Sequence, residues 1–408
     1  MRTFESDLCI IGAGAAGLQI AHSLKGSGLK VRLLESGFKT FDYATQALGH
    51  FENSGLPIRQ SSQPYDLNTL ADTAPYCRMY GGTLQVWQKR CSLPDPIDFQ
   101  KRPEIPFSGW PISFDELLPY LRKTALQLGV EALFSLDTSS KAWLRSEFEP
   151  LEYPAVCGGS AIRLVLSSDK RQIDHLLVRA LDGEEWQECA ERFILACGTI
   201  ENTRLLLASG FESFTPWLGR NLLDHPKGVF GMIEVAEKPF SFCLPEDLLR
   251  KEKLPNHRFD LSMPPFIRIH LDQMPSQTSH IELSNQKNAL GEPRARVDWH
   301  LSDEDRVNAV KAIHLACASV EERGLGKVKL RPEFETLDFL EDASHHLGTT
   351  RMGESPEEGV VDRNCKFFGI DNLYIAGNSL FPTAGNAYPT LILLALAERL
   401  ADHLKGSR

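Results

Sequence analysis

With 408 residues, 42% of them hydrophobic and 24% charged, the chain has the composition of an ordinary globular protein and the length of two domains. Its formal net charge is −10 and it holds no basic block, which argues against a nucleic-acid partner. No apolar run reaches the length of a membrane span. The first residues, MRTFESD, lead directly into the first expected strand and leave no room for a signal peptide. The nine cysteines are scattered without a CxxC pair, so we expect a reduced, cytoplasmic protein.

Residues 7–35 predict a strand, a glycine-rich turn, a helix and a second strand. The apolar run Leu8–Ile11 leads into Gly-Ala-Gly-Ala-Ala-Gly at positions 12–17. A helical pattern follows, glycines end it, and a second apolar run occupies Val31–Leu34. This order is typical of the unit that binds a dinucleotide, and every part of that unit is present at the required spacing.

Each glycine of this turn has a physical role. Gly12 makes the tight turn, Gly14 lets a pyrophosphate approach the backbone, and Gly17 lets the helix lie close to the strand. Glu35, about twenty residues further on, can accept hydrogen bonds from a ribose, which disfavours the 2′-phosphate of NADP. The motif alone does not separate NAD from FAD. The expected cofactor contacts of this unit are Gly12, Gly14, Ala15, Ala16, Gly17 and Glu35.

The stretch 36–75 is polar, rich in proline and without clear periodicity, so irregular surface structure over the cofactor is expected there. The next informative segment is Gly81-Gly82-Thr83. Paired glycines allow a close backbone approach to a ligand, or they form a tight turn between packed segments, and the local sequence leaves both readings open. Further on, Ser113 and Glu116 form an S-x-x-E capping box, which predicts the start of a helix.

Strand patterns return between Ser160 and Cys197, with a hairpin turn at Asp182-Gly183. The end of this stretch has the same order as the opening unit, with an apolar strand followed by Gly198 and a helix over Thr203–Ser209. That pattern fits a third strand entering the same sheet near the cofactor. His225 follows in a polar loop, and an isolated histidine of this kind is more often structural than catalytic.

The region 229–340 has a different character. Strands are predicted at 229–235, 266–271, 280–283 and 295–300, and a helix from Ser302 to about Glu322. The fold class is therefore α/β (α+β overall), with a Rossmann-like cofactor-binding domain and a second, substrate-binding domain on a mostly antiparallel sheet. The expected boundaries are 1–228 with 341–408 for the first domain, in which 36–75 and 100–150 are peripheral lid or cap segments, and 229–340 for the second.

The end of the chain adds a polar loop at 344–353 and an apolar strand that ends at Gly377-Asn378. A helix is predicted from near Thr390 to about Leu404, and Pro389 suits its first turn. The amino terminus of this helix offers free N–H groups and positive charge at a dinucleotide site. That arrangement suits an anionic reduced flavin better than a nicotinamide and therefore favours FAD.

Taken together, these segments resemble the glucose–methanol–choline (GMC) oxidoreductases, a family of FAD enzymes that oxidise alcohols and sugars. The matching segments follow the family's order over nearly the whole chain. They are GAGAAG at 12–17, GGT at 81–83, GWPISFDEL at 109–117, LACGTIENTRLLLASG at 195–210, LGRNLLDHP at 218–226, QMPSQTSHIELS and LGEPRARVDW within 273–299, HHLGTTRMG at 345–353, VVD at 360–362 and NLYIAGNSLFPTAGNAYPT at 372–390.

The resemblance implies a role for the histidine of the H-x-x-G-T motif, which here is His345. It would take the proton of an alcohol while a hydride leaves for flavin N5. Where the family has a second His or Asn, this chain has Tyr388, which can donate a hydrogen bond to an alkoxide, and Asn386 is the other candidate. Several family members attach FAD through a histidine that precedes a tryptophan. Here Val86 precedes Trp87, so non-covalent FAD is expected.

The resemblance also implies further cofactor contacts, at Gly81, Gly82, Thr83, Gly198, Gly377, Asn378, Pro389 and Thr390. No metal is expected. The adjacent histidines 345 and 346 point in opposite directions on an extended chain, and no cysteine or carboxylate cluster in the sequence supports them.

Three functions stay open at this point. The first is FAD-dependent oxidation of a CH–OH group of a sugar, polyol or biosynthetic intermediate, with oxygen or another electron acceptor. The second is isomerisation, desaturation or cyclisation on the same fold, which the departure at Tyr388 motivates. The third is a non-catalytic flavoprotein subunit, because the cap is short for the family and implies either an open pocket or a partner protein that completes it.

Overall fold

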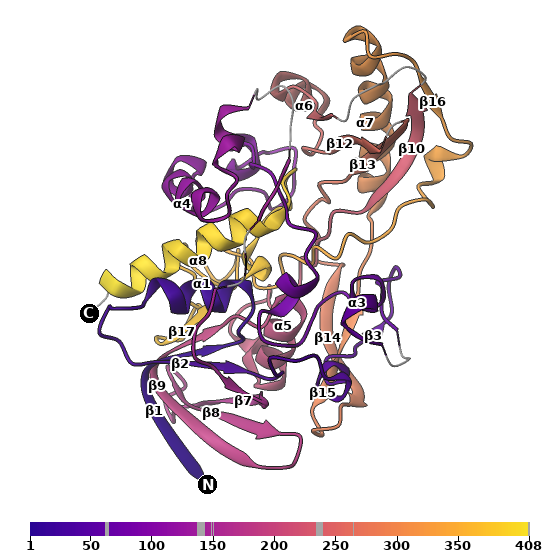
Figure 1. Ribbon diagram of the computed structural model, residues 1–408. Helices are drawn as coiled ribbons and strands as arrows, with labels where there is room; N and C mark the ends of the chain where they lie inside the picture. Colours follow the sequence, from indigo (N-terminus) through magenta and orange to yellow (C-terminus); the bar gives the residue numbers. More distant parts are fainter. Residues whose placement is uncertain are drawn as a thin grey trace.

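Two main sheets and the helices packed on them form the described part of the chain. The computed structural model describes residues 1–61, 65–136, 143–147, 149, 151–233, 240–263 and 265–406. The larger sheet has seven strands and lies at the bottom of Figure 1, whereas the five-stranded sheet lies at the upper right. This mixed arrangement confirms the predicted fold class.

The centre of the larger sheet is parallel, as the opening motif predicts. β1 (Arg2–Ile11) lies between β2 (Val31–Glu35) and β9 (Glu185–Leu195) and runs parallel to both. β17 (Leu373–Ile375) also pairs in parallel with the end of β9. Its apolar side chains are buried with those of β1 and β9, so the last part of the chain completes the core that the first part begins.

Antiparallel strands extend this sheet on one side. β7 (Gly159–Leu166) pairs with β8 (Ile173–Ala180), and β8 pairs with β9 through the predicted turn at Asp182-Gly183. Gly183 has a φ of 90°, a conformation that favours glycine, which explains the turn.

Three helices are stacked outward from one side of the larger sheet, in the order α1, α8 and α4. α1 (Ala15–Ser23) packs against α8 (Pro389–Gly406), and α4 (Phe114–Gln127) packs on α8. Figure 1 shows α8 in yellow lying along α1 in indigo, so the two ends of the chain meet here. The predicted start of α4 is confirmed, because the Ser113 hydroxyl accepts a hydrogen bond from the Glu116 N–H at 3.1 Å.

The second sheet is antiparallel between all neighbouring strands. Its order is β11 (Ser241–Cys243), β12 (Arg258–Met263), β13 (Phe266–His270), β10 (Lys227–Ile233) and β16 (Val328–Leu330). α7 (Asp303–Glu322) contributes Ala309, Ile313 and Ala316 to the core of this sheet. Residues 234 and 235 of the strand expected at 229–235 lie outside the described residues.

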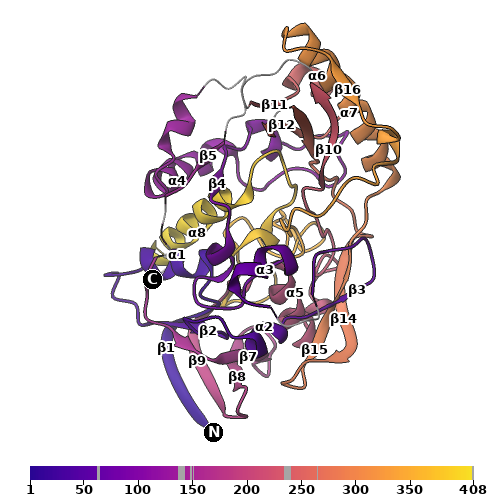
Figure 2. The same ribbon diagram turned by 45° about the vertical axis from the view of Figure 1, so that its right-hand side comes forward.

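A hairpin from the middle of the chain joins neither of these sheets. β14 (His280–Lys287) and β15 (Pro293–Asp298) form a third sheet with β3 (Glu52–Asn53) and pack on α5 (Thr199–Ala208). Figure 2 shows this hairpin beside α5, below the second sheet. The hairpin lies on α5 because its apolar side chains are buried there, with Ile281 and Val297 against Ile200. The domain boundaries stay a prediction, but this part of 229–340 packs with elements assigned to the first domain.

Two local expectations were wrong. α5 begins at Thr199 rather than at Thr203, because its first turn is buried and so shows no amphipathic period. The stretch 36–75 holds two short helices, α2 (Tyr43–Ala47) and α3 (Leu67–Thr73), which Asp42 and Asp66 cap.

The seventh strand of the larger sheet is β6 (Val156–Cys157), which pairs in parallel with β2 at its edge. The remaining short elements are the paired strands β4 (Arg90–Cys91) and β5 (Leu144–Arg145), the helix α6 (Glu246–Glu252) and 3₁₀ turns at Gly82–Val86, Pro96–Phe99, Glu131–Ser135, Phe211–Ser213, Phe334–Thr336 and Asn378–Leu380. Within the described residues, no helix combines the length and the apolar character that crossing a membrane requires.

Candidate active site

A cavity of about 470 Å³ lies where the parallel strands of the larger sheet end. Its lining includes Ile11 and Glu35 at the ends of β1 and β2, Ala196 after β9, and residues of β10 and β13 from the second sheet. Ligands of open α/β sheets bind at this edge. The predicted site residues in its wall are Gly12, Gly14, Ala15, Ala16, Glu35, Gly82, Thr83, Gly198, His345, Gly377, Asn378, Tyr388, Pro389 and Thr390.

The glycine turn shows why its residues lack side chains. Gly12 has a φ of 104°, and a β-carbon there would lie 2.5 Å from the Ala196 carbonyl oxygen. A β-carbon on Gly17 would overlap the Gly12 carbonyl oxygen, so this glycine lets α1 approach β1. A β-carbon on Gly82 would lie 2.8 Å from the Cα of Gly14, while the Gly81 N–H donates to the Ala13 carbonyl oxygen at 2.9 Å. The paired glycines therefore pack directly on the dinucleotide motif.

The Glu35 carboxylate is fixed at the end of β2 by backbone donors. One oxygen accepts from the Ala13 N–H at 2.9 Å and the other from the Gly37 N–H at 2.8 Å. The side chain is buried but lines the cavity. The oxygen that faces Gly37 also accepts from the Ser36 hydroxyl at 3.2 Å, but the oxygen that faces Ala13 has further acceptor capacity, so Glu35 can still receive a ribose hydroxyl.

Two helix amino termini face the same cavity. α1 starts after Gly14, which has no side chain to cap the helix, and α8 starts at Pro389 and Thr390. Nearby, the buried Asn378 Oδ1 has no hydrogen-bond partner within the described residues. Free helix N–H groups and their partial positive charge suit a diphosphate and an anionic ring system. These residues therefore fit a bound flavin dinucleotide.

His345 is paired with His225 by the geometry of two loops. Leu223 and Leu347 form an antiparallel bridge, with backbone hydrogen bonds of 3.2 and 2.9 Å. Residues two positions from such a pair face each other, and His225 Nδ1 lies 3.1 Å from His345 Nδ1. Asp224 Oδ1 accepts the backbone N–H of both histidines, at 2.6 and 3.1 Å. The pair is thus held as a unit.

The surroundings keep His345 neutral. Burial lowers the pKa of the His345 imidazole well below its ordinary value, and the nearby His225 and Lys227 lower it further. A neutral imidazole has one nitrogen that can accept a proton, which is the state required of a general base.

Tyr388 stands beside His345, whereas Asn386 points elsewhere. The Tyr388 and His345 rings are 6.0 Å apart edge to face, and the Tyr388 hydroxyl lies 3.5 Å from Arg90 Nη1. The Asn386 amide donates to Asp95 and Asp98 at 2.8 and 3.1 Å, behind the cavity wall. The structure therefore brings only one of the two expected partners, Tyr388, to His345.

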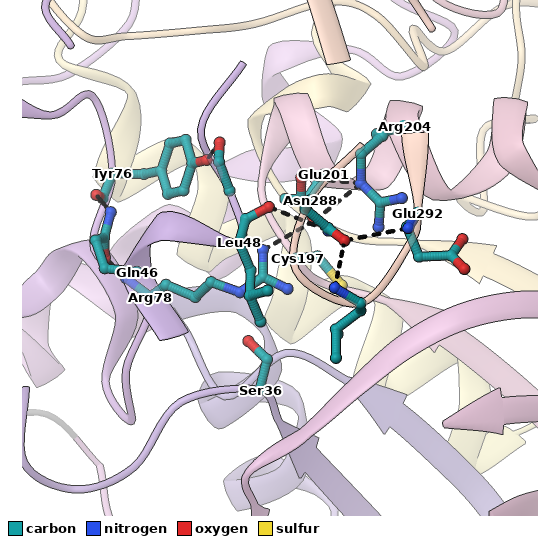
Figure 3. A network of polar contacts seen from close by, with 12 residues as sticks. Ser36, Gln46, Leu48, Tyr76, Arg78, Cys197, Glu201, Arg204, Asn288 and Glu292 are labelled. Atoms are coloured by element: carbon teal, nitrogen blue, oxygen red, sulfur yellow. Dashed lines mark hydrogen bonds and ion pairs between the residues drawn. The ribbon is translucent and has the colours of Figure 1, made fainter. Parts of the chain in front are cut away.

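A buried ion network is the main feature that the sequence analysis missed. Arg78 donates to Glu201 at 3.0 Å, and Arg204 donates to the same carboxylate at 3.1 Å, as Figure 3 shows. Burial raises the pKa of the Glu201 carboxyl, but the two guanidinium groups outweigh it and hold the pKa below its usual value. All three side chains line the cavity. Glu201 and Arg204 are three residues apart on α5, a spacing at which two charges can pair, but Arg78 is 123 residues from Glu201 and no local signal links it to them.

One group of buried side chains has the composition of a metal site. Asp224, Asp342 and His346 place one potential ligand atom each within 4.8 Å of one another. Asp342, however, already lies 3.4 Å from the Arg59 guanidinium and accepts from the Ser344 hydroxyl at 2.8 Å. The expectation of no metal stays a prediction.

Two family models, both described as GMC oxidoreductase, match residues 137–227 and 275–397. Together they cover slightly more than half of the chain. Among curated proteins, the 6'''-hydroxyparomomycin C oxidase of Streptomyces lividus is 25% identical, over 98% of this chain and 92% of that protein. The fructose dehydrogenase large subunit of Gluconobacter japonicus is 21% identical, over 98% of each. Dehydrogenase str4 of Strobilurus tenacellus is 38% identical, but over only 16% of this chain and 11% of that protein.

Solved structures share the fold over the whole chain. Pyridoxine 4-oxidase from Mesorbium loti superimposes with a TM-score of 0.67 at 19% identity, covering 98% of this chain and 99% of that one. A formate oxidase variant from Aspergillus oryzae, described for its FAD modification, gives a TM-score of 0.70 at 15% identity, covering 100% and 99%. At these identities the likeness concerns the fold.

Proposed function

Because the chain belongs to the GMC oxidoreductase family, and is therefore an oxidoreductase that uses FAD, we propose that it oxidises the CH–OH group of a small alcohol. The observation that carries this proposal is the His345–Tyr388 pair in the wall of the cavity that also holds the dinucleotide motif. FAD supplies the hydride acceptor when it is bound. The chain's own residues must position the alcohol and remove its proton.

His225 sets the tautomer of His345. His225 Nε2 lies 2.9 Å from the Gly385 carbonyl oxygen, and a carbonyl only accepts, so this nitrogen carries the ring proton. In the neutral ring, His225 Nδ1 is then an acceptor and receives the Nδ1–H of His345. The lone pair of His345 is left on Nε2, where it can take the proton of the alcohol.

Tyr388 orients the alcohol oxygen. Its ring is held between the edges of His345 and His270, at 6.0 and 5.9 Å, and the Arg258 guanidinium lies 5.2 Å from its centre. Its hydroxyl can donate a hydrogen bond to the oxygen as negative charge develops there, a role for which a preorganised donor is suited. This gives the departure from the family's His or Asn a chemical function.

The cofactor is held without a covalent bond. Val86 occupies the position before Trp87 and offers no nucleophilic atom, and both residues line the cavity. The glycine backbone, the amino termini of α1 and α8 and the Glu35 carboxylate would supply the contacts to it. Denaturing the protein with acid should therefore release the flavin into the supernatant.

The test is the rate at which alcohols bleach the flavin without air. His345→Ala should slow this reduction by about 10²–10⁴-fold, the range for a general base, while the protein keeps its FAD absorbance. His300→Gln, an exposed histidine paired with Asp298 at 2.8 Å, is the control and should leave the rate unchanged. An unchanged rate in His345→Ala, or a colourless protein that FAD cannot reconstitute, would overturn the proposal.

A further inference from the structure

Positive charge gathers on the wall of the cavity that the second sheet provides. Lys227 and His270 are directly opposite in the β10–β13 pair, and Arg268 is opposite Val229. Directly opposed residues and residues two apart share one face of a sheet. Lys227, Arg268 and His270 therefore project from one face, and all three line the cavity.

The two cations of this wall have no direct ion-pair partner. Among the described residues, no ion pair within 4.0 Å joins a carboxylate to Lys227 or Arg268. Asp260 lies opposite Arg268 in the β12–β13 pair, and the Glu341 and Asp224 carboxylates act on Lys227 only from a greater distance. Arg59 and Arg90 also line the cavity, and Arg59 pairs with Asp342. The chain as a whole carries a net charge of −10, so this concentration of positive charge is local.

His270 adds a buried polar atom without a partner. Its side chain is 5% exposed, and its Nε2 has no hydrogen bond within the described part of the chain. Burial and the neighbouring Arg258 lower the pKa of the His270 imidazole well below its ordinary value, so the ring is neutral. An unpaired buried nitrogen costs free energy unless a ligand pairs with it.

We propose that the substrate is an alcohol that carries an anionic group, a carboxylate or a phosphate, bound by Lys227 and Arg268 with His270. This inference rests on the proposed function and adds the substrate class. An anion recovers the desolvation cost of two unpaired cations, and guanidinium and ammonium groups are the usual ligands of carboxylates and phosphates. His270 is adjacent to Tyr388, and Tyr388 to His345, so an anion held on this wall places its hydroxyl at the catalytic pair.

The cofactor phosphates are a poor explanation for these cations. The dinucleotide motif that receives a diphosphate lies at the ends of β1 and β2, where Gly12, Gly14 and Glu35 line the cavity. Lys227 and Arg268 stand on the other sheet, in β10 and β13, and His270 of β13 lies 5.9 Å from the Tyr388 ring of the proposed catalytic pair. Experiment can separate the cofactor phosphates from an anionic substrate, because a variant that removes a contact to the phosphates should lower FAD content and a variant that removes a contact to the substrate should not.

The experiment has a binding arm and a reaction arm, both on the FAD-loaded enzyme. In the first, acetate and inorganic phosphate are titrated while the flavin spectrum is followed. In the second, matched neutral and anionic alcohols, such as glycerol, glycerate and glycerol 3-phosphate, are compared for the rate of anaerobic bleaching. The variants are Lys227→Met and Arg268→Met, and the control is Lys329→Met, an exposed lysine of β16.

We expect one of the anions to bind the wild type about tenfold or more tightly than it binds either variant. The anionic alcohol of the same class should bleach the flavin at lower concentration than its neutral partner, and both variants should lose this preference. Lys329→Met should keep it. If acetate is the anion that the variants bind less tightly, the substrate is a hydroxy acid. If phosphate is that anion, the substrate is a phosphorylated alcohol.

The inference is overturned if neither anion distinguishes the wild type from the variants, if neutral alcohols bleach the flavin as readily as anionic ones, or if the variants lose FAD. If no alcohol bleaches the flavin, the proposed function fails instead. In that case the binding arm still decides whether Lys227 and Arg268 form an anion site.

Discussion

Replacing His225 tests whether this buried histidine fixes the tautomer of the catalytic one. His225→Ala removes two hydrogen bonds, one to Gly385 and one from His345. It leaves a buried carbonyl oxygen and the buried His345 Nδ1–H without partners, at about 1–3 kcal/mol each. We expect a loss of roughly 2–6 kcal/mol in unfolding free energy.

The effect on rate follows from the same bond. Without an acceptor at Nδ1, His345 is free to place its proton on Nε2, where it cannot act as a base. A lost preference of about 1.5 kcal/mol changes the ratio of the two tautomers by roughly tenfold, so a competent tautomer that made up about 90% of His345 falls to about half. Flavin reduction should therefore slow by about twofold or more while FAD stays bound.

His225→Asn is the matched variant. Its Oδ1 can stand near the position of the original Nδ1 and accept from His345, although the contact to Gly385 is lost. It should recover most of the rate but not the stability.

The assay is stopped-flow reduction without air, with a double-mutant cycle. His225→Ala should have no further effect in a His345→Ala background, because the two residues act as one unit. The reasoning is refuted if His225→Ala reduces its flavin at the wild-type rate at every pH, or if the two effects multiply.

Three further predictions concern the same cavity. Tyr388→Phe keeps the ring contacts and removes only the donor, so reduction should slow by about 10²-fold with little change in melting temperature, and equal rates would exclude the hydroxyl. The lowered pKa of His345 predicts that the rate of flavin reduction is at its maximum above the ordinary histidine pKa and falls only as the pH drops well below 6.5, and a rate profile centred at 6.5 would contradict this. The unfolding free energy should also decrease as the pH falls below 6.5, because the unfolded state binds the proton more readily. Arg78→Met leaves Glu201 with one of its two partners and should cost about 3–5 kcal/mol of stability by denaturant unfolding, with Glu201→Gln as the comparison that removes the buried charge itself.

The sequence predicted those parts of the fold that depend on near neighbours. The turn at 12–17, its flanking strands and Glu35 lie within one short unit, and their roles follow from backbone geometry that only glycine tolerates. The starts of α4 and α7 were also predictable, because a serine side chain and the N–H three residues later form the cap. Such features need no knowledge of the rest of the chain.

The arrangement of the candidate active site could not be predicted from the sequence alone, because it depends on contacts between segments that are distant along the chain. His225, which the sequence favours as structural, faces His345 because a bridge joins Leu223 to Leu347. Asn386 and Tyr388 are equally plausible by position, yet the backbone turns one toward Asp95 and the other toward the cavity.

By itself the sequence determined the cofactor motif, the family and the candidate for the base, because the residues that identify them stand in short motifs that follow one another along the chain. Only the tertiary structure decided which histidine lies against His345, which of Tyr388 and Asn386 lies beside it, and where cations without an ion-pair partner collect. The physical reason is that hydrogen bonding and charge pairing act over a few ångströms in space, and spatial neighbours such as residues 225 and 345 are set by sheet register and loop closure rather than by spacing along the chain.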